Sequence, residues 1–251
     1  MGNSIYHSSV IYNRLIRLNL GQIFSSTVMN HILSILISVF LRGYRGKTVD
    51  FACASPCHRT TIAHFLNHGK WEDAKLEMIL KEAVVRTIYG ESLRSGKPVF
   101  SIVDDTISSK TKPSSRALNP IEDAYFHQSH LKRRQDYGHQ AVSIMLSCNG
   151  FVLNYAVIMY DKSKSKIKIV QEIAQELPAP PFPSFFLCDS WYTSADIIQA
   201  FIKKGFFTVG ALKTNRILYP AGYKMQVSEL ASYMKESMPS IHTVTVRKRK
   251  Q

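Results

Sequence analysis

The spacing of apolar residues along the chain changes near residue 95. Before that point apolar side chains recur every three or four residues, as in IAHFLN and WEDAKLEMILKEAVVRTIYG. This spacing is typical of amphipathic helices. The turn sequence SGKP at 95–98 ends the pattern. We therefore predict an α-helical N-terminal region over residues 1–95 and a second domain over residues 96–251.

The second domain alternates between short apolar runs and helical segments. Asn149-Gly150 separates two of the runs, and Asn-Gly at such a place is a strong signal for a tight hairpin. The order strand, hairpin, helix, strand, helix, strand predicts an α/β fold with a mixed sheet flanked by helices. The first three strands should be antiparallel and the later ones parallel. Strands are expected near 98–104, 139–148, 151–160, 184–189 and 206–212, with helices near 165–177 and 194–204.

The most apolar stretch of the chain is HILSILISVFL, residues 31–41. It falls well short of the roughly 20 residues that a membrane-spanning helix needs, and it contains Ser34 and Ser38. A buried helix is the favoured interpretation, and an amphipathic membrane anchor is the weaker alternative. We expect no membrane partner.

Charge narrows the range of partners. The chain has 32 Lys and Arg against 18 Asp and Glu, a formal net charge of +14. Such an excess indicates a polyanion, either nucleic acid or an anionic membrane surface, and composition alone does not choose between them. Four cysteines are scattered along the chain with no secretory signal before them, which predicts free thiols in a reducing cytosol.

Two aspartates follow apolar strand-like runs 85 residues apart. Asp104 follows VFSIV, and Asp189 follows FFLC. Each alone would be read as a turn or helix-capping residue. Together, at the ends of two strands where α/β sheets usually place their sites, they favour a shared Mg²⁺. A pair of such ions could activate a water or hydroxyl in phosphoryl transfer. Asp105 should point away, because successive strand residues face opposite sides.

Basic residues are expected beside this pair of aspartates. The segment HQSHLKRRQDYGHQ and the residues after FFTVGAL could contact DNA phosphates, or they could be solvated loops. Trp191 and Tyr192 could stack on an unpaired base, although aromatic residues there more often pack over the sheet. The candidate DNA-binding residues are Lys132, Arg133, Arg134, His139, Lys213, Asn215 and Arg216.

Four blocks of the sequence together resemble a DDE-type insertion-sequence transposase. They are VDDT, YFHQSHLKRRQDYGHQAVSIMLS, FFLCDSWYTSADII and FFTVGALKTNRILYP, and the similarity runs from about residue 98 to 220. The resemblance implies a ribonuclease-H-like core that cleaves and transfers DNA strands during transposition with Mg²⁺ or Mn²⁺. It also implies that Asp104 and Asp189 are catalytic metal ligands, with Asp105 as the neighbour that could be confused with Asp104.

The same resemblance sets expectations for partners and location. Double-stranded DNA, at the transposon ends and at the target, is the expected partner, and homo-oligomer formation is left open. The expected location is cytoplasmic and associated with the nucleoid.

The third acid of that family is missing from the pattern. It is a glutamate on a helix after the fifth strand, with a tyrosine, an arginine and a lysine at fixed spacing. Here only Glu229 and Glu236 follow LKTNRILYP, and neither has those neighbours. We therefore expect a sequence truncated before the third acid. The alternative function is a catalytically inactive DNA-binding remnant of such a transposase.

Two further segments have a functional and a structural interpretation. RTTIAHFLNHGKW could be the second helix of a helix-turn-helix that reads DNA, or it could be a helix that only packs. Cys53, Cys57 and His58 lie close together, but zinc sites usually need four ligands in paired clusters, so buried thiols are favoured.

Overall fold

The computed structural model describes the chain except for residues 1, 44–46, 117–120, 130–131 and 238–251. It divides into two compact units, Met1–Ala83 and Val84–Gln251, each described here by itself. The division falls within helix α5 (Asp73–Ser95), so residues from one helix belong to both units. The functional boundary after residue 95 stays a prediction.

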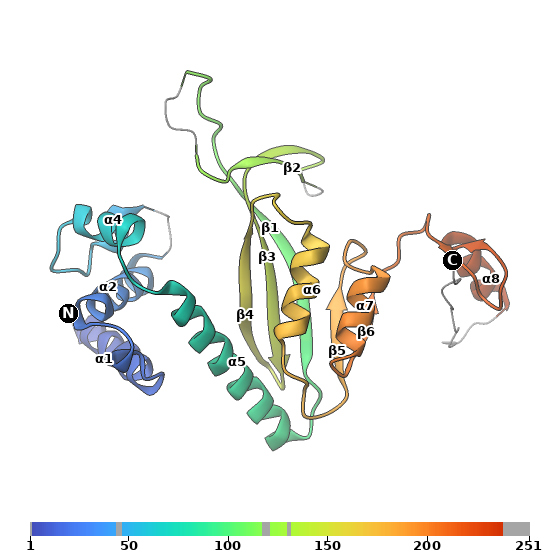
Figure 1. The fold of residues 1–251 in the computed structure, drawn as a ribbon, viewed down its shortest axis with the longest axis horizontal. Coiled ribbons are helices and arrows are strands. Elements are labelled where there is room, and N and C mark those ends of the chain that lie inside the picture. Colours follow the sequence, from blue (N-terminus) through green and yellow to red (C-terminus); the bar gives the residue numbers. More distant parts are fainter. Residues whose placement is uncertain (1, 44–46, 117–120, 130–131, 238–251) are drawn as a thin grey trace. The chain divides into compact units, whose positions relative to one another are not determined.

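The first unit is helical, as the apolar spacing predicts. It contains α1 (Gly2–Arg17), the 3₁₀ turn η1 (Leu20–Gln22), α2 (Ser26–Arg42), α3 (Thr48–Phe51), α4 (Arg59–His68) and the beginning of α5 (Figure 1). Ser25 caps α2, because its side chain accepts a hydrogen bond from the backbone N of Val28. The buried core of this unit consists of Ile11, Leu15, Leu20, Phe24 and Ile37.

The apolar segment 31–41 lies inside α2. Ser38 is 1% exposed, and its hydroxyl donates to the carbonyl of Phe51 (2.8 Å) and accepts from the backbone N of Ala54 (3.2 Å). These two bonds let a serine stay buried in an apolar helix. Phe40, near the helix end, is 67% exposed. Among the residues that the structure describes, no helix is both long enough and apolar enough to cross a membrane.

The second unit is built on a mixed sheet. β3 is antiparallel to both β1 and β4, whereas β5 is parallel to both β1 and β6. The resulting order β4-β3-β1-β5-β6, with helices packed on the sheet, is ribonuclease-H-like and confirms the predicted fold class. The elements are β1 (Phe100–Ser109), β2 (Tyr125–Ser129), β3 (Arg134–Cys148), β4 (Phe151–Tyr160), α6 (Lys166–Glu176), β5 (Ser184–Cys188), α7 (Ala195–Ile202) and β6 (Phe206–Gly210).

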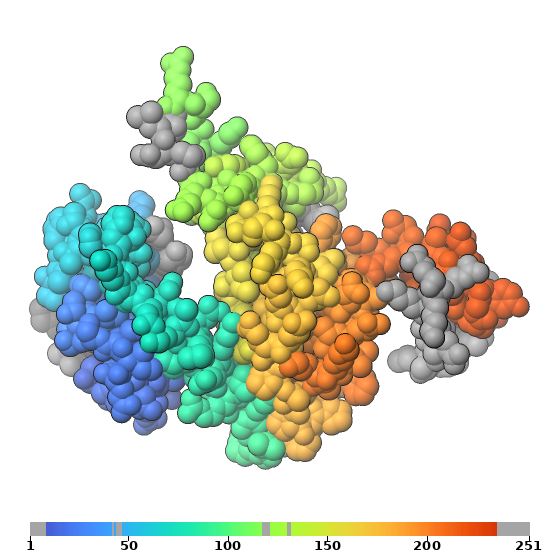
Figure 2. Space-filling model, viewed as in Figure 1, coloured from blue at the N-terminus to red at the C-terminus, as the bar shows by residue number. Residues whose placement is uncertain are grey.

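The two faces of this sheet differ in how they are covered. One face packs against α6 and α7, and their atoms hide much of the strands in the space-filling view (Figures 1 and 2). Alternate β3 residues such as Val142 and Ile144 are fully buried there. Side chains on the other face are far more exposed, including Val157 (56%) and Phe207 (59%). The sheet therefore has one covered and one open face.

Two predicted strand boundaries are wrong. β1 continues five residues past Asp104, because its pairing with β3 extends to Ser109 opposite Gly138. No strand was expected between residues 105 and 138, but β2 lies there and β3 begins at Arg134, and the two form an antiparallel pair. Asp104 consequently lies in the middle of a strand rather than at its end. The chain after β6 also forms a small hairpin, β7 (Ile217–Leu218) with β8 (Met225–Gln226), followed by α8 (Val227–Ser237).

Candidate active site

The candidate ligands are held by neighbouring parallel strands: Asp104 lies within β1, and Asp189 directly follows β5. The pairing of β1 with β5 ends at Ile102 opposite Leu187. Asp104 and Asp189 each come two residues later in the chain, and both are exposed. Side chains two residues apart on a strand face the same side, so Asp104 lies on the open face with Ile102.

A tight turn surrounds the Asp189 carboxylate. Its Oδ1 accepts hydrogen bonds from the backbone N of Trp191 (2.9 Å) and of Tyr192 (3.3 Å). The same turn packs directly against the end of β6, because a Cβ added to Gly210 would lie 2.6 Å from the Cγ2 of Thr193. Only glycine fits at that approach. The turn thus restricts the orientation of the Asp189 carboxylate.

Asp105 occupies the covered face, as strand alternation predicts. Its Oδ2 accepts a hydrogen bond from the Tyr192 hydroxyl (3.0 Å) and forms an ion pair with Nζ of Lys166, the first residue of α6 (2.5 Å). The backbone N of Asp105 donates to Oδ1 of Asp104 (2.8 Å). Sequence analysis missed the roles of Tyr192 and Lys166. A usable signal existed, because an aspartate alternating with buried Val103 needs a polar partner on the covered face.

The aspartates of the candidate site affect the pKa of two neighbouring groups. Tyr192 is 1% exposed, and burial raises the pKa of its hydroxyl, with the charges of Asp105, Asp189 and Asp104 raising it further. Tyr192 therefore stays protonated and remains a hydrogen-bond donor. Burial and then the charge of Asp189 raise the pKa of the Cys188 thiol to about 11. A bound cation would offset the charges of these aspartates.

Three cationic side chains lie near the Asp189 turn. Nζ of Lys166 lies 5.5 Å from the ring centroid of Trp191, and Nζ of Lys213 lies 4.6 Å from it. Lys166 is committed to its ion pair, and the Arg216 guanidinium donates to the carbonyl of Thr193. Lys213 has no carboxylate partner in the described part of the chain. It is therefore the cation most available to an anion, and the predicted residue Asn215 is exposed in the same loop.

Most of the other predicted basic residues belong to the β2–β3 hairpin, whose His127 is close enough to Asp105 for that charge to affect its pKa, and their contact with DNA stays a prediction. Asp104 pairs with Ser143, and along β3 His139 is four residues and Arg134 nine residues from Ser143. In that hairpin Lys132 forms an ion pair with Asp136 (2.7 Å), Arg133 adopts φ 50°, and His139 Nε2 lies 2.8 Å from the carbonyl of Glu122.

The donor set at Asp104 and Asp189 fits a hard divalent cation. Carboxylate oxygens are the ligands that Mg²⁺ prefers, and it commonly takes only one or two of them from protein. Across the described residues there is no group of three or more His, Cys, Asp or Glu side chains that could hold a metal. Glu229 caps the start of α8, since its Oε2 accepts from the backbone N of Gln226 (2.9 Å). The Glu236 side chain lies outside the described part of the structure.

Comparison with known families now identifies the class of protein. The model of the transposase DDE domain matches residues 95–251. The chain therefore belongs to the transposases with a DDE domain, a family that generally depends on a divalent metal.

Comparisons with solved structures and with curated proteins give weaker information about the class of protein. Among solved structures, the chain is similar to a piggyBac transposase in a synaptic complex with hairpin DNA, at 14% identity and a TM-score of 0.36. That match covers 75% of this chain and 41% of the other, so the chain spans less than half of that transposase. A search among curated proteins gave no match.

Proposed function

We propose that this chain carries the DNA cleavage and strand-transfer site of an insertion-sequence transposase, with Asp104 and Asp189 as the metal-binding catalytic acids. The observation that carries the proposal is the pairing of β1 with β5, which ends two residues before each aspartate. Parallel neighbours bring equivalent positions of the two strands level with each other. Two exposed carboxylates at such positions can bind one cation.

Bound Mg²⁺ or Mn²⁺ would activate a water or hydroxyl and stabilise the leaving oxygen of a phosphodiester. The chain's own residues would bind the cation and a DNA phosphate beside it. Asp104 and Asp189 supply oxygen ligands, and the turn from Asp189 to Tyr192 fixes the second of these. Lys213, exposed against Trp191, would bind a DNA phosphate next to them.

The proposed partner is double-stranded DNA, at the ends of the element and at its target. The net charge of +14 supports a polyanionic partner. Besides Lys213, we assign phosphate contacts to basic residues of the β2–β3 hairpin and to the loop after β6. This set comprises Lys132, Arg133, Arg134, His139, Asn215 and Arg216.

The N-terminal unit is proposed to bind DNA as well. Its helix α4 buries Ile62 and Phe65 and exposes polar side chains such as Arg59 and His64. No Asp or Glu occurs from Phe51 to Trp71. This surface suits the phosphates and base edges of a duplex. We place the protein with the DNA of the nucleoid.

A nicking assay tests the proposed chemistry. Supercoiled plasmid incubated with the protein and Mn²⁺ should be converted to open circles. Asp104→Asn and Asp189→Asn should each slow this conversion by about 100-fold or more, because a metal ion contributes several kcal/mol to the stabilisation of the transition state. Asp196→Asn, which changes an exposed acid of α7, is the matched control and should nick at the wild-type rate. Equal rates for all four proteins would refute the assignment.

DNA binding without cleavage is the second candidate function. It is favoured by the position of Glu229, which caps its own helix, and by the lack of a three-acid group in the described residues. In that case the wild-type protein would bind duplex DNA in a salt-dependent manner and leave the plasmid supercoiled at every Mn²⁺ concentration.

A further inference from the structure

A continuous chain of hydrogen bonds joins the two candidate metal ligands on the covered side of the sheet. Asp189 Oδ1 accepts from the backbone N of Tyr192 (3.3 Å), and the Tyr192 hydroxyl donates to Asp105 Oδ2 (3.0 Å). The backbone N of Asp105 then donates to Asp104 Oδ1 (2.8 Å). Tyr192 therefore contacts Asp189, and Asp105 contacts Asp104, although neither Tyr192 nor Asp105 has an assigned role.

We propose that Tyr192 and Asp105 are positioning residues, which hold the Asp104 and Asp189 carboxylates at a fixed separation for the divalent cation. The inference rests on the proposed metal site and adds to it. Asp105 and Tyr192 are 87 residues apart in sequence, and their hydrogen bond connects β1 directly to the turn after β5. Without it, no other side-chain bond between described residues would join Asp104's strand to that turn.

Burial makes this connection rigid. Tyr192 is 1% exposed and belongs to the apolar core under α6 and α7, so its ring has little freedom to move. The Tyr192 hydroxyl lies at the edge of that core, where it donates a hydrogen bond to Asp105. The aspartate is in turn neutralised by Lys166, whose side chain is only 15% exposed. A carboxylate with both a cation and a hydroxyl as partners keeps a defined orientation.

The arrangement also explains why two adjacent aspartates are used differently. Asp104 is exposed and engaged only by the backbone N of Asp105 among the hydrogen bonds of the described residues, so its oxygens can bind a cation. Asp105 already has a lysine and a tyrosine as partners. Removing a group that orients a metal ligand through a hydrogen bond typically lowers the metal affinity by about 10–100-fold.

The test is a Mn²⁺ titration followed by calorimetry on the full chain. Tyr192→Phe removes only the hydroxyl and should weaken Mn²⁺ binding about 10-fold or more. Asp105→Ala should do the same, and the double variant should be no weaker than either single variant, because both break one link. Asp105→Asn keeps an oxygen acceptor for Tyr192 and should stay within about 3-fold of wild type, below the usual range for losing an orienting group.

Tyr89→Phe is the matched control for a general effect of removing a buried hydroxyl. Tyr89 is 8% exposed, and its hydroxyl donates to the carbonyl of Pro178 (2.6 Å). This variant should bind Mn²⁺ as the wild type does, while urea unfolding should show a loss of stability similar to that of Tyr192→Phe. If Tyr192→Phe and Tyr89→Phe both kept wild-type Mn²⁺ affinity, the positioning role would be refuted while the metal site stood. A wild-type protein that bound no Mn²⁺ would refute the site and the positioning role together.

Discussion

The adjacent residues Asp104 and Asp105 of β1 have different roles, because they face opposite sides of the sheet. Asp104 is exposed on the open face, whereas Asp105 is engaged by Lys166 and Tyr192 on the covered face. Strand geometry alone enforces this separation, since neighbouring side chains point in opposite directions. One Asp-Asp pair can thus supply both a candidate metal ligand and an internal support.

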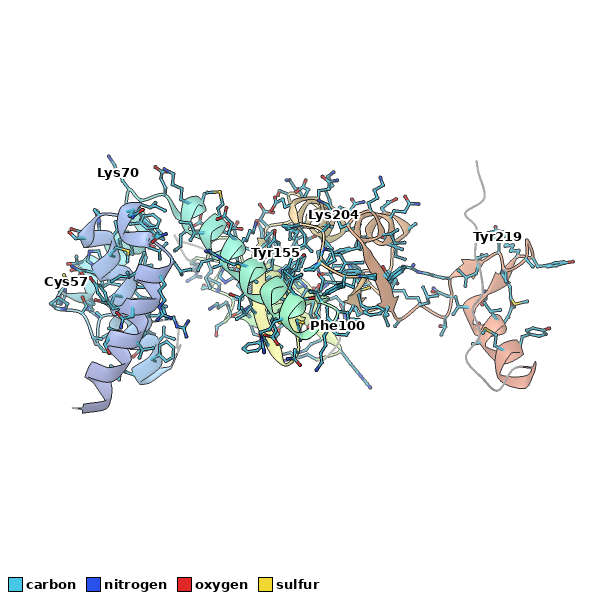
Figure 3. The ribbon with its side chains drawn as sticks, turned by 90° about the horizontal axis from the view of Figure 1, so that it is seen from below. Cys57, Lys70, Phe100, Tyr155, Lys204 and Tyr219 are labelled. Atoms are coloured by element: carbon cyan, nitrogen blue, oxygen red, sulfur yellow. The ribbon has the colours of Figure 1, made fainter. Side chains whose placement is uncertain are left out.

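Lys213 offers a residue-level test of DNA contact. Lys213→Ala should weaken binding to duplex DNA and reduce the slope of log affinity against log salt by about 1. The slope falls because a protein with one phosphate contact fewer releases fewer counterions when it binds. Fluorescence anisotropy with labelled duplex over a salt series measures both quantities. Lys204→Ala is the control, since Lys204 (labelled in Figure 3) donates instead to the carbonyl of Gln175 (2.6 Å). An unchanged slope for Lys213→Ala would argue against the contact.

At the scale of elements, the tight turn between β3 and β4 sets the register of the hairpin. Asn149 and Gly150 both have positive φ, 48° and 85°, which is the signature of a two-residue turn that matches strand twist. The Asn149 side chain also forms two hydrogen bonds to residues outside the hairpin: it accepts from Lys97 Nζ and donates to Glu91 (2.6 Å each). The turn is therefore fixed both by backbone conformation and by its contacts.

Two glycine substitutions of the same size should have opposite effects on stability. Gly150→Ala places a Cβ in open space but at φ +85°, so it should lower the free energy of unfolding by about 1 kcal/mol. Gly90→Ala, also with open space but inside helix α5, should raise it by about 0.5–1 kcal/mol. Urea unfolding measures both. A stabilising Gly150→Ala would show that the turn does not have this conformation.

The β2 strand should make stability depend on pH. Burial lowers the pKa of His127, the charge of Lys162 lowers it further, and a hydrogen bond to Gly138 and the charge of Asp105 act in the opposite direction. An unfolded histidine takes up its proton near pH 6.5, above the pKa of the folded form, so the unfolded state binds more protons as the pH falls. The free energy of unfolding should therefore decrease as the pH falls through about 6.5.

His127→Gln removes this titration and provides the comparison. Urea unfolding of both proteins at pH 7.5, 6.5 and 5.5 should show a smaller loss in the variant than in the wild type. Other histidines are common to both proteins and cancel in the difference. Parallel pH profiles would mean that His127 contributes nothing to the dependence.

Local signals predicted the elements well, and long-range pairing limited the rest. The Asn149-Gly150 hairpin and the α6 and α7 helices follow from nearby residues, including the capping side chains of Ser165 and Ser194. The extension of β1 to Ser109 depends on a partner some 30 residues away, which no local pattern encodes. For the same reason the sequence indicated Asp104 and Asp189 but not the bond between Asp105 and Tyr192.

At the scale of the whole chain, charge and fold support one account. A strongly basic chain that belongs to the DDE-domain transposases has a ribonuclease-H-like sheet, and two neighbouring parallel strands of that sheet hold its two candidate acids. Lysine and arginine provide affinity for DNA that needs no acidic residues, whereas catalysis needs the acids to hold a metal. The central claim is therefore the metal site.

Calorimetric titration of Mn²⁺ into the wild type and three single variants tests that claim most directly. The wild type should bind Mn²⁺, and Asp104→Asn and Asp189→Asn should each reduce the affinity at least about 10-fold, because each removes a charged oxygen ligand. Asp105→Asn should bind nearly as well as the wild type, since its side chain is not a metal ligand and Asn keeps an oxygen acceptor for the Tyr192 hydroxyl. Loss of binding in Asp105→Asn with full binding in Asp104→Asn would contradict the account.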